Sequence, residues 1–134
     1  MRTIGTAVFS RFAHQGQVCM CANRILAQRS IYSKFLDRFV DRVSRLKAGD
    51  PRDPRTDLGP LMNQRQTETF MKQVQRGIDE GARVALRGKA EGNVVSPTVF
   101  ADVTPNMWVA RNEVRSGSLC DAVRHAGRRC AHGQ

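Results

Sequence analysis

The sequence predicts a layered α/β fold, in which helices pack on a short and mostly parallel sheet. Segments with the period of amphipathic helices alternate with short strand-like runs. Such alternation is typical of parallel sheets that are covered by helices. With 134 residues, of which 40% are apolar, the chain can build one modest core.

Two segments open this arrangement. Residues 2–14 carry apolar residues at helical spacing, so they predict a helix that ends before Gly16. Residues 24–31 predict a short buried strand, although the run is too brief for its hydrophobic period alone to distinguish a strand from a helix.

Residues 30–49 predict the clearest helix of the chain. We expect Ser33 to cap its start and Gly49 to follow its last turn. Asp41 and Arg45 stand four residues apart, in the order that favours an ion pair. One apolar stripe predicts the buried face: Tyr32, Phe35, Leu36, Phe39, Val40, Val43 and Leu46.

A proline-rich connection and a second long helix follow. Residues 50–61 hold three prolines and predict an irregular loop. Asn63 and Gln66 have the spacing of a capping box, and Gly81 should end the helix that starts there.

The last regular segments are two strands and a tail. Residues 82–88 and 94–103 predict strands that are joined by a turn at 88–93, and Pro97 favours an edge or a bulge for the second strand. Residues 115–134 lack a sustained period and large apolar residues, so we expect a divergent, disordered tail after a segment that spans residues 1–114.

The net charge of +10 leaves two interpretations. Spread-out basic residues usually form a solvated surface, whereas a basic nucleic-acid-binding or protein-interaction module without catalysis is the alternative. No helix-turn-helix or zinc-finger pattern supports that alternative. No apolar run approaches the ~18 residues of a membrane helix, and no cleavage-site pattern stands near the start, so we expect a cytoplasmic protein.

Four cysteines are present: Cys19, Cys21, Cys120 and Cys130. Without a secretory signal we do not expect a disulfide framework. No C-x2-C pairing is present, so we expect no metal site either.

The segment FAHQGQVCMCAN, residues 12–23, has features of a nucleophile site. Gly16 permits a sharp backbone turn that could aim the next cysteine at a pocket. If residues 20–23 begin a helical turn, the Cys19 thiolate would lie beside its positive end and its N–H groups. Those groups could stabilise an oxyanion, although a packing role for the cysteine remains open.

The same segment resembles the active-site cysteine signature of the aldehyde dehydrogenase superfamily. The resemblance continues through residues 23–66, with a strand, a long helix and a "GDP…GP" loop, and through residues 96–113, which lead to the glutamate of the E-x-F-G-P motif. Among the subfamilies, it is closest to enzymes for aromatic aldehydes such as benzaldehyde, salicylaldehyde or vanillin. The implied fold is a partial aldehyde dehydrogenase catalytic domain.

The resemblance implies that Cys19 attacks the aldehyde carbonyl to give a thiohemiacetal, which is oxidised to a thioester by NAD or NADP and hydrolysed to the carboxylic acid. Glu113 corresponds to the glutamate that binds the cofactor ribose, a role that suits an acceptor of two hydroxyl donors. Full-length members of the family are homo-oligomers.

Two neighbours of Cys19 have other expected roles. Cys21 is expected to pack, and the alternative is a strained, protective bridge to Cys19. His14 is interpreted as a residue at a helix end, because the base of the family does not stand at this position.

The sequence departs from the family pattern at both ends. The family's Rossmann-type cofactor site, general-base glutamate and oxyanion-hole asparagine precede the part that is matched here. After Glu113 the chain continues Val114-Arg115-Ser116-Gly117 instead of hydrophobic-Phe-Gly-Pro. We interpret this break as a reading-frame change or a truncated gene copy. We therefore expect uncovered apolar helix faces and an inactive isolated chain that has low stability, aggregates, or needs a partner to supply the missing half.

Overall fold

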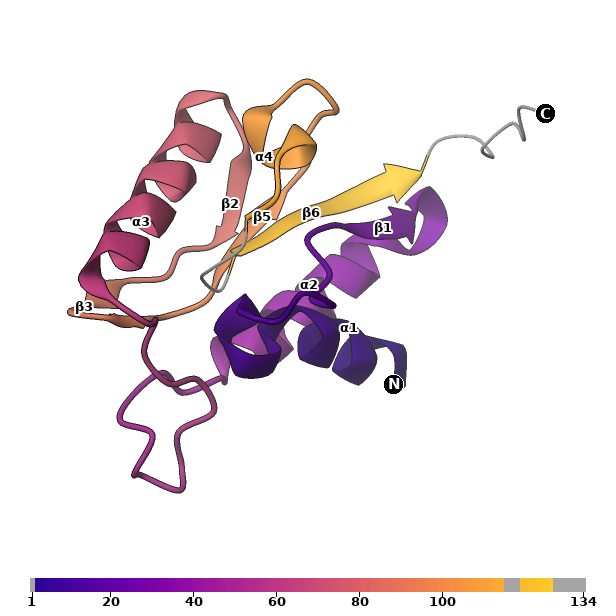
Figure 1. Cartoon of the computed structure of the whole chain (residues 1–134). Coiled ribbons are helices and arrows are strands. Elements are labelled where there is room, and N and C mark those ends of the chain that lie inside the picture. Colours follow the sequence, from indigo (N-terminus) through magenta and orange to yellow (C-terminus); the bar gives the residue numbers. More distant parts are fainter. Residues whose placement is uncertain (1, 115–118, 127–134) are drawn as a thin grey trace.

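A four-stranded sheet between two groups of helices forms the centre of the molecule (Figure 1). The computed structural model describes residues 2–114 and 119–126. The strand order is β1-β6-β5-β2. The β1–β6 and β5–β6 pairs are parallel, whereas β2 and β5 are antiparallel. The predicted α/β fold with a mostly parallel sheet is therefore confirmed.

The chain enters this fold through helix α1 (Arg2–Phe12), followed by the short 3-10 helix η1 (Ala13–Gly16). Strand β1 (Ile25–Gln28) and a 3-10 turn, η2 (Arg29–Ile31), lead to helix α2 (Tyr32–Ser44). The first helix and the position of the first strand agree with the prediction.

Strand β1 differs from its prediction in burial, because Ala27 alone among its residues is buried. Among the described strands, β1 lies at an edge of the sheet and has β6 as its one neighbour.

The bounds of α2 correct the expected caps. Ser33 lies inside the helix, and the N-cap position belongs to Ile31, which makes no side-chain cap. The helix ends at Ser44 and therefore stops well before Gly49. The expected stripe is present, since Leu36, Phe39 and Val43 are its buried residues. The predicted Asp41–Arg45 ion pair forms at 2.9 Å.

Helix α3 (Gln64–Asp79) begins as predicted, because the side chain of Asn63 accepts a hydrogen bond from Gln66 N at 2.9 Å. Gly81 adopts a φ of +90° just after the helix, which is the conformation that favours glycine there. Strand β2 (Arg83–Leu86) follows.

The predicted strand over 94–103 is divided at Pro97, which cannot donate to a ladder. Strand β4 (Val94–Val95) pairs with β3 (Ala90–Glu91) in a small hairpin, and β5 (Thr98–Ala101) joins the main sheet. Of the two expected features, the edge position is wrong for β5, because β6 and β2 flank it and all four of its residues are buried. The expected irregularity is present, since the pairing of β5 with β6 shifts register between Val99 and Ala101. The short helix α4 (Trp108–Arg111) comes next.

Strand β6 (Leu119–Ala126) lies inside the segment that we expected to be disordered. It occupies the sheet position between β1 and β5. Two parallel neighbours supply its pairing partners, so its short-range sequence pattern carried little information about it. The rest of the tail, residues 115–118 and 127–134, lies outside the described residues.

Side chains of β5 alternate between two cores. Phe100 joins Phe70, Val74 and Val109 on the side of α3 and α4. Its neighbours Val99 and Ala101 join the core of α1 and α2, which includes Phe12, Phe39 and Val43. The buried faces of both long helices are thus covered, contrary to our expectation. The low stability expected of the isolated chain stays a prediction.

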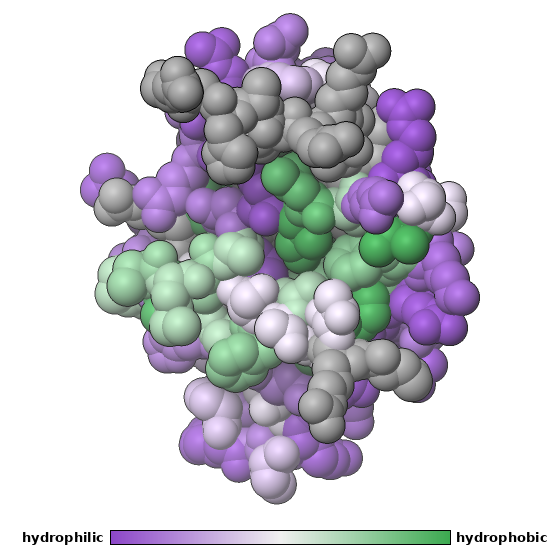
Figure 2. All heavy atoms as spheres, turned by 90° about the vertical axis from the view of Figure 1, so that its right-hand side faces the viewer, coloured by the Kyte–Doolittle hydropathy of each residue, from purple (hydrophilic) through white to green (hydrophobic). Residues whose placement is uncertain are grey.

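Some apolar side chains outside the two cores are exposed on the surface. Figure 2 shows the side of the molecule on the right of Figure 1, where apolar side chains form a band across the middle. The large apolar residues with high exposure are Phe9, Met20, Leu26, Ile31 and Met62. Among the described residues, no helix is long and apolar enough to cross a membrane.

Candidate active site

Residues 17–24, here called the cysteine loop, connect η1 to β1. The chain reverses before this loop through three successive left-handed residues, with φ values of 49° at His14, 55° at Gln15 and 71° at Gly16. Glycine adopts such values freely, whereas the two preceding residues adopt them at a cost. This turn sends the cysteine loop back along α1.

Cys19 occupies a corner of a tight turn. The amide of Cys21 donates to the carbonyl oxygen of Val18 at 3.0 Å, so Cys19 and Met20 form the middle of a β-turn. The Cys19 side chain is exposed.

The helical turn expected at residues 20–23 is absent. The amide of Ala22 instead donates to the carbonyl oxygen of Ser10 at 2.8 Å, which ties the cysteine loop to α1. A helix dipole therefore does not act on Cys19 in this structure.

Cys21 lies on the inner side of the same loop. It is half-buried, and its Sγ lies 3.6 Å from the carbonyl oxygen of Ala13, the distance of a weak S–H hydrogen bond. Cys19 and Cys21 are both free thiols. The geometry agrees with the packing role expected for Cys21.

Arg11 is a residue of this region that the sequence analysis missed. Its side chain is fully buried, and its Nη1 donates to Asn23 Oδ1 at 2.9 Å. A signal was present: Arg11 continues the spacing of Ile4, Ala7 and Val8, so a charged residue stands on the apolar stripe of α1. Buried cations usually have a specific polar partner.

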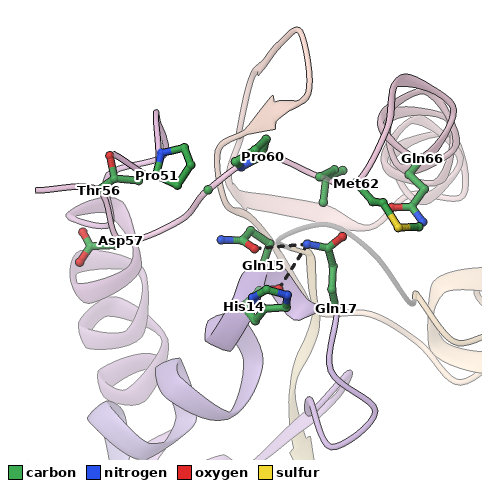
Figure 3. Close-up of a pocket in the computed structure, with 11 residues that line it drawn as sticks. His14, Gln15, Gln17, Pro51, Thr56, Asp57, Pro60, Met62 and Gln66 are labelled. Carbon is green, nitrogen blue, oxygen red and sulfur yellow. Dashed lines mark hydrogen bonds between the residues drawn. The ribbon is translucent and has the colours of Figure 1, made fainter. Parts of the chain in front are cut away.

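A polar cavity of about 870 Å³ lies beside the cysteine loop (Figure 3). It is bounded by η1, by the loop of residues 50–61 and by the start of α3. Its polar side chains are His14, Gln15, Gln17, Thr56, Asp57 and Gln66. The side-chain amides of Gln15 and Gln17 lie 3.2 Å apart.

Gln66 gives this cavity an unusual feature. Its Oε1 is buried and has no hydrogen-bond partner among the residues that the structure describes. A buried acceptor of this kind normally requires a donor. Together with the amides of Gln15 and Gln17 and the carboxylate of Asp57, it forms a set of groups that fits hydroxyl and amide groups of a cofactor such as NAD.

Glu113 is exposed and lies shortly after α4, next to the buried Val114. Among the described residues that line the cavity, neither Cys19 nor Glu113 is present. The cavity, the nucleophile candidate and the glutamate candidate are thus three separate positions of this structure. The loop expected to support Glu113 begins at residue 115, outside the described residues.

The metal alternative has no support in the part of the chain with described side chains, where no group of three or more His, Cys, Asp or Glu is close enough to hold an ion. The side chains of Cys120, His125, Cys130 and His132 lie outside that part.

Comparison with known proteins identifies the family. The model of the aldehyde dehydrogenase family matches residues 1–116, and the chain belongs to that family. Benzaldehyde dehydrogenase YfmT of Bacillus subtilis is 50% identical over 111 residues, which cover 83% of this chain and 23% of the relative. Vanillin dehydrogenase of Corynebacterium glutamicum is 38% identical over 108 residues, which cover 81% of this chain and 22% of the relative.

A solved structure gives the same result. An NAD-dependent benzaldehyde dehydrogenase from Corynebacterium glutamicum superposes with a TM-score of 0.84 at 36% identity, covering 92% of this chain and 26% of that chain. The chain therefore spans about a quarter of the length of these proteins.

Proposed function

We propose that this chain is the nucleophile-bearing segment of an NAD(P)-dependent dehydrogenase that oxidises an aromatic aldehyde to its carboxylic acid. The observation that carries the proposal is the placement of Cys19, exposed at the corner of a turn that is tied to α1. The relatives named for benzaldehyde and vanillin support an aromatic substrate. The proposal keeps the cytoplasmic location expected from the sequence.

The chemistry begins at the sulfur of Cys19. Its thiolate adds to the aldehyde carbon, so a C–S bond forms and the carbonyl oxygen becomes an oxyanion. Oxidation of this thiohemiacetal gives a thioester, and water then cleaves the C–S bond to release the acid and the thiol. An oxidised nicotinamide cofactor, when bound, supplies the electron acceptor that the oxidation needs.

The cavity residues would hold part of that cofactor. Gln66 offers an acceptor that is buried without a partner among the described residues, and Gln15, Gln17 and Asp57 add polar groups around it. Glu113 remains our proposed ligand of the ribose hydroxyls. By the resemblance, the Rossmann-type cofactor site of the family precedes the part that is matched here, so we propose that the isolated chain does not turn over.

A chimera tests this function directly. Residues 1–114 would replace the matching segment of the Bacillus subtilis benzaldehyde dehydrogenase, which is half identical to this chain in that region. We expect the chimera to form NADH from benzaldehyde. Cys19→Ser should lower kcat by at least about a thousandfold, because a serine hydroxyl is a much weaker nucleophile than a thiolate. Glu113→Gln should mainly raise the KM for the cofactor.

Two controls complete the design. Cys21→Ser should leave the activity of the chimera nearly unchanged, since the Cys21 thiol contacts the Ala13 carbonyl of η1. A folded chimera that retains activity after Cys19→Ser would contradict the proposed role. A folded chimera that is inactive with Cys19 present would contradict the proposed function of the segment.

The alternative function as a basic module has little support beyond the net charge. Several exposed arginines are already paired with carboxylates, namely Arg45 with Asp41, Arg52 with Asp50, and Arg55 with Asp53. Steeply salt-dependent binding to DNA would favour that alternative.

A further inference from the structure

We propose that Arg11 is a positioning residue for Cys19, because its bond to Asn23 latches the cysteine loop onto the end of α1. The proposal rests on the proposed function of Cys19, since positioning has a purpose only if that thiol reacts. Arg11 and Asn23 are the two members of this latch.

The placement of Arg11 suits such a role. The residue lies in the last turn of α1, and its side chain is fully buried although it carries a charge. Its Nη1 donates to Asn23 Oδ1 at 2.9 Å, across twelve residues of sequence. A hydrogen bond from a cationic donor is stronger than one between neutral groups, and a buried setting strengthens it further.

The latch fixes the end of the cysteine loop that leads into the sheet. Asn23 stands two residues before β1, so its position determines where the loop leaves α1. The other end of the loop is fixed by the left-handed residues His14, Gln15 and Gly16. The turn that carries Cys19 is therefore held on both sides.

The other contacts of the cysteine loop, with α1 and with η1, differ from this bond in kind. The Ala22–Ser10 bond joins main-chain atoms, and the contact of Cys21 Sγ with the Ala13 carbonyl at 3.6 Å is weak. The Arg11–Asn23 bond joins two side chains, so a substitution can remove it while the backbone stays intact. Its loss should let the loop lift from α1, which would expose Cys21 and release the orientation of Cys19.

Two measurements on the full chain report these effects. The first is the rate at which iodoacetamide alkylates each of Cys19 and Cys21, resolved by peptide mass spectrometry. We expect Asn23→Ala and Arg11→Met to raise the Cys21 rate about tenfold. The second is the rate at which 4-nitrophenyl benzoate acylates Cys19, which we expect to fall by a similar factor.

Matched variants separate positioning from general damage. Arg38→Met and Asn106→Ala remove the same side-chain types from exposed positions and should change neither rate. Asn23→Asp retains an acceptor for Arg11, so both rates should equal those of the unaltered chain. The double variant Arg11→Met/Asn23→Ala should show less than the sum of the two single effects, because both substitutions remove the same bond. Circular dichroism must show each variant folded at the assay temperature.

The outcomes are distinguishable. If folded Asn23→Ala and Arg11→Met keep the Cys21 alkylation rate and the Cys19 acylation rate of the unaltered chain, the latch is overturned. Additive effects in the double variant would also overturn it. If the unaltered chain fails to acylate at Cys19, the proposed function fails, while Cys21 protection still reports whether the latch exists.

Discussion

Tyr32 and Asp102 are joined by two hydrogen bonds across 70 residues of sequence. The Tyr32 hydroxyl donates to Asp102 Oδ1 at 2.6 Å, and the Asp102 amide donates to the same hydroxyl oxygen at 3.2 Å. Arg83 Nε contacts the second carboxylate oxygen at 2.6 Å. Asp102 adopts a left-handed φ of 56° just after β5. These contacts among Tyr32, Asp102 and Arg83 tie the start of α2 to one end of the β2–β5 pair.

Tyr32→Phe should lower the free energy of unfolding by about 1 kcal/mol, because it removes the hydroxyl that both bonds share. Urea denaturation at pH 7 would measure the loss. Asp37→Asn, an exposed change on the same helix, is the control and should have little effect. Equal stability of Tyr32→Phe and the unaltered chain would show that the two bonds contribute nothing net.

The same tyrosine predicts a pH dependence. Partial burial, followed by the hydrogen bond to Asp102, raises the pKa of Tyr32 above its usual value of 10.0. The unfolded tyrosine therefore loses its proton at a lower pH than the folded one. Its contribution to stability is present below about pH 10 and is lost as the pH rises through the folded pKa. Tyr32→Phe should show a shallower loss of stability in alkaline buffer.

Gly77→Ala should destabilise the fold by about 1–3 kcal/mol, because α3 packs so closely on β5 at this point that a methyl group has no room. A Cβ at Gly77 would lie 2.6 Å and 2.8 Å from two atoms of the Phe100 ring. Gly5→Ala is the matched control, since nothing lies within 4 Å of the added methyl group in α1. That change should stabilise the protein by about 0.5–1 kcal/mol. Thermal unfolding of both variants would reveal the opposite signs.

Mild peroxide should oxidise Cys19 to a sulfenic acid without closing a bridge to Cys21. Cys19 is exposed at the turn corner, whereas the sulfur of Cys21 is held near the Ala13 carbonyl. Dimedone would trap the sulfenic acid, and mass spectrometry would locate it. Detection of a reducible link between residues 19 and 21 would instead support the protective bridge.

Strong local patterns made the helices predictable. The stripe of α2 and the Asn63 cap of α3 follow from nearest-neighbour geometry, and both are present. The place of β5 in the middle of the sheet and the existence of β6 depend on pairing between distant segments. A short run of residues does not encode such pairing, so the sequence analysis missed β6.

The candidate site was predictable only in part. The resemblance singled out Cys19 and Glu113, and the family is confirmed. The β-turn around Cys19 replaced the expected helical turn because Ala22 bonds to Ser10, a contact between segments that period alone does not show. The latch from Arg11 to Asn23 could have been suspected from a charge on an apolar stripe, but its partner could not.

Acylation by 4-nitrophenyl benzoate tests the central claim, that Cys19 is the nucleophile, without any need for cofactor. We expect one benzoyl group per chain, located by peptide mass spectrometry on Cys19, with release of nitrophenolate. Cys19→Ser should abolish this burst, and Cys21→Ser should preserve it. Benzoylation spread evenly over cysteines and lysines, or a burst that survives Cys19→Ser, would contradict the account.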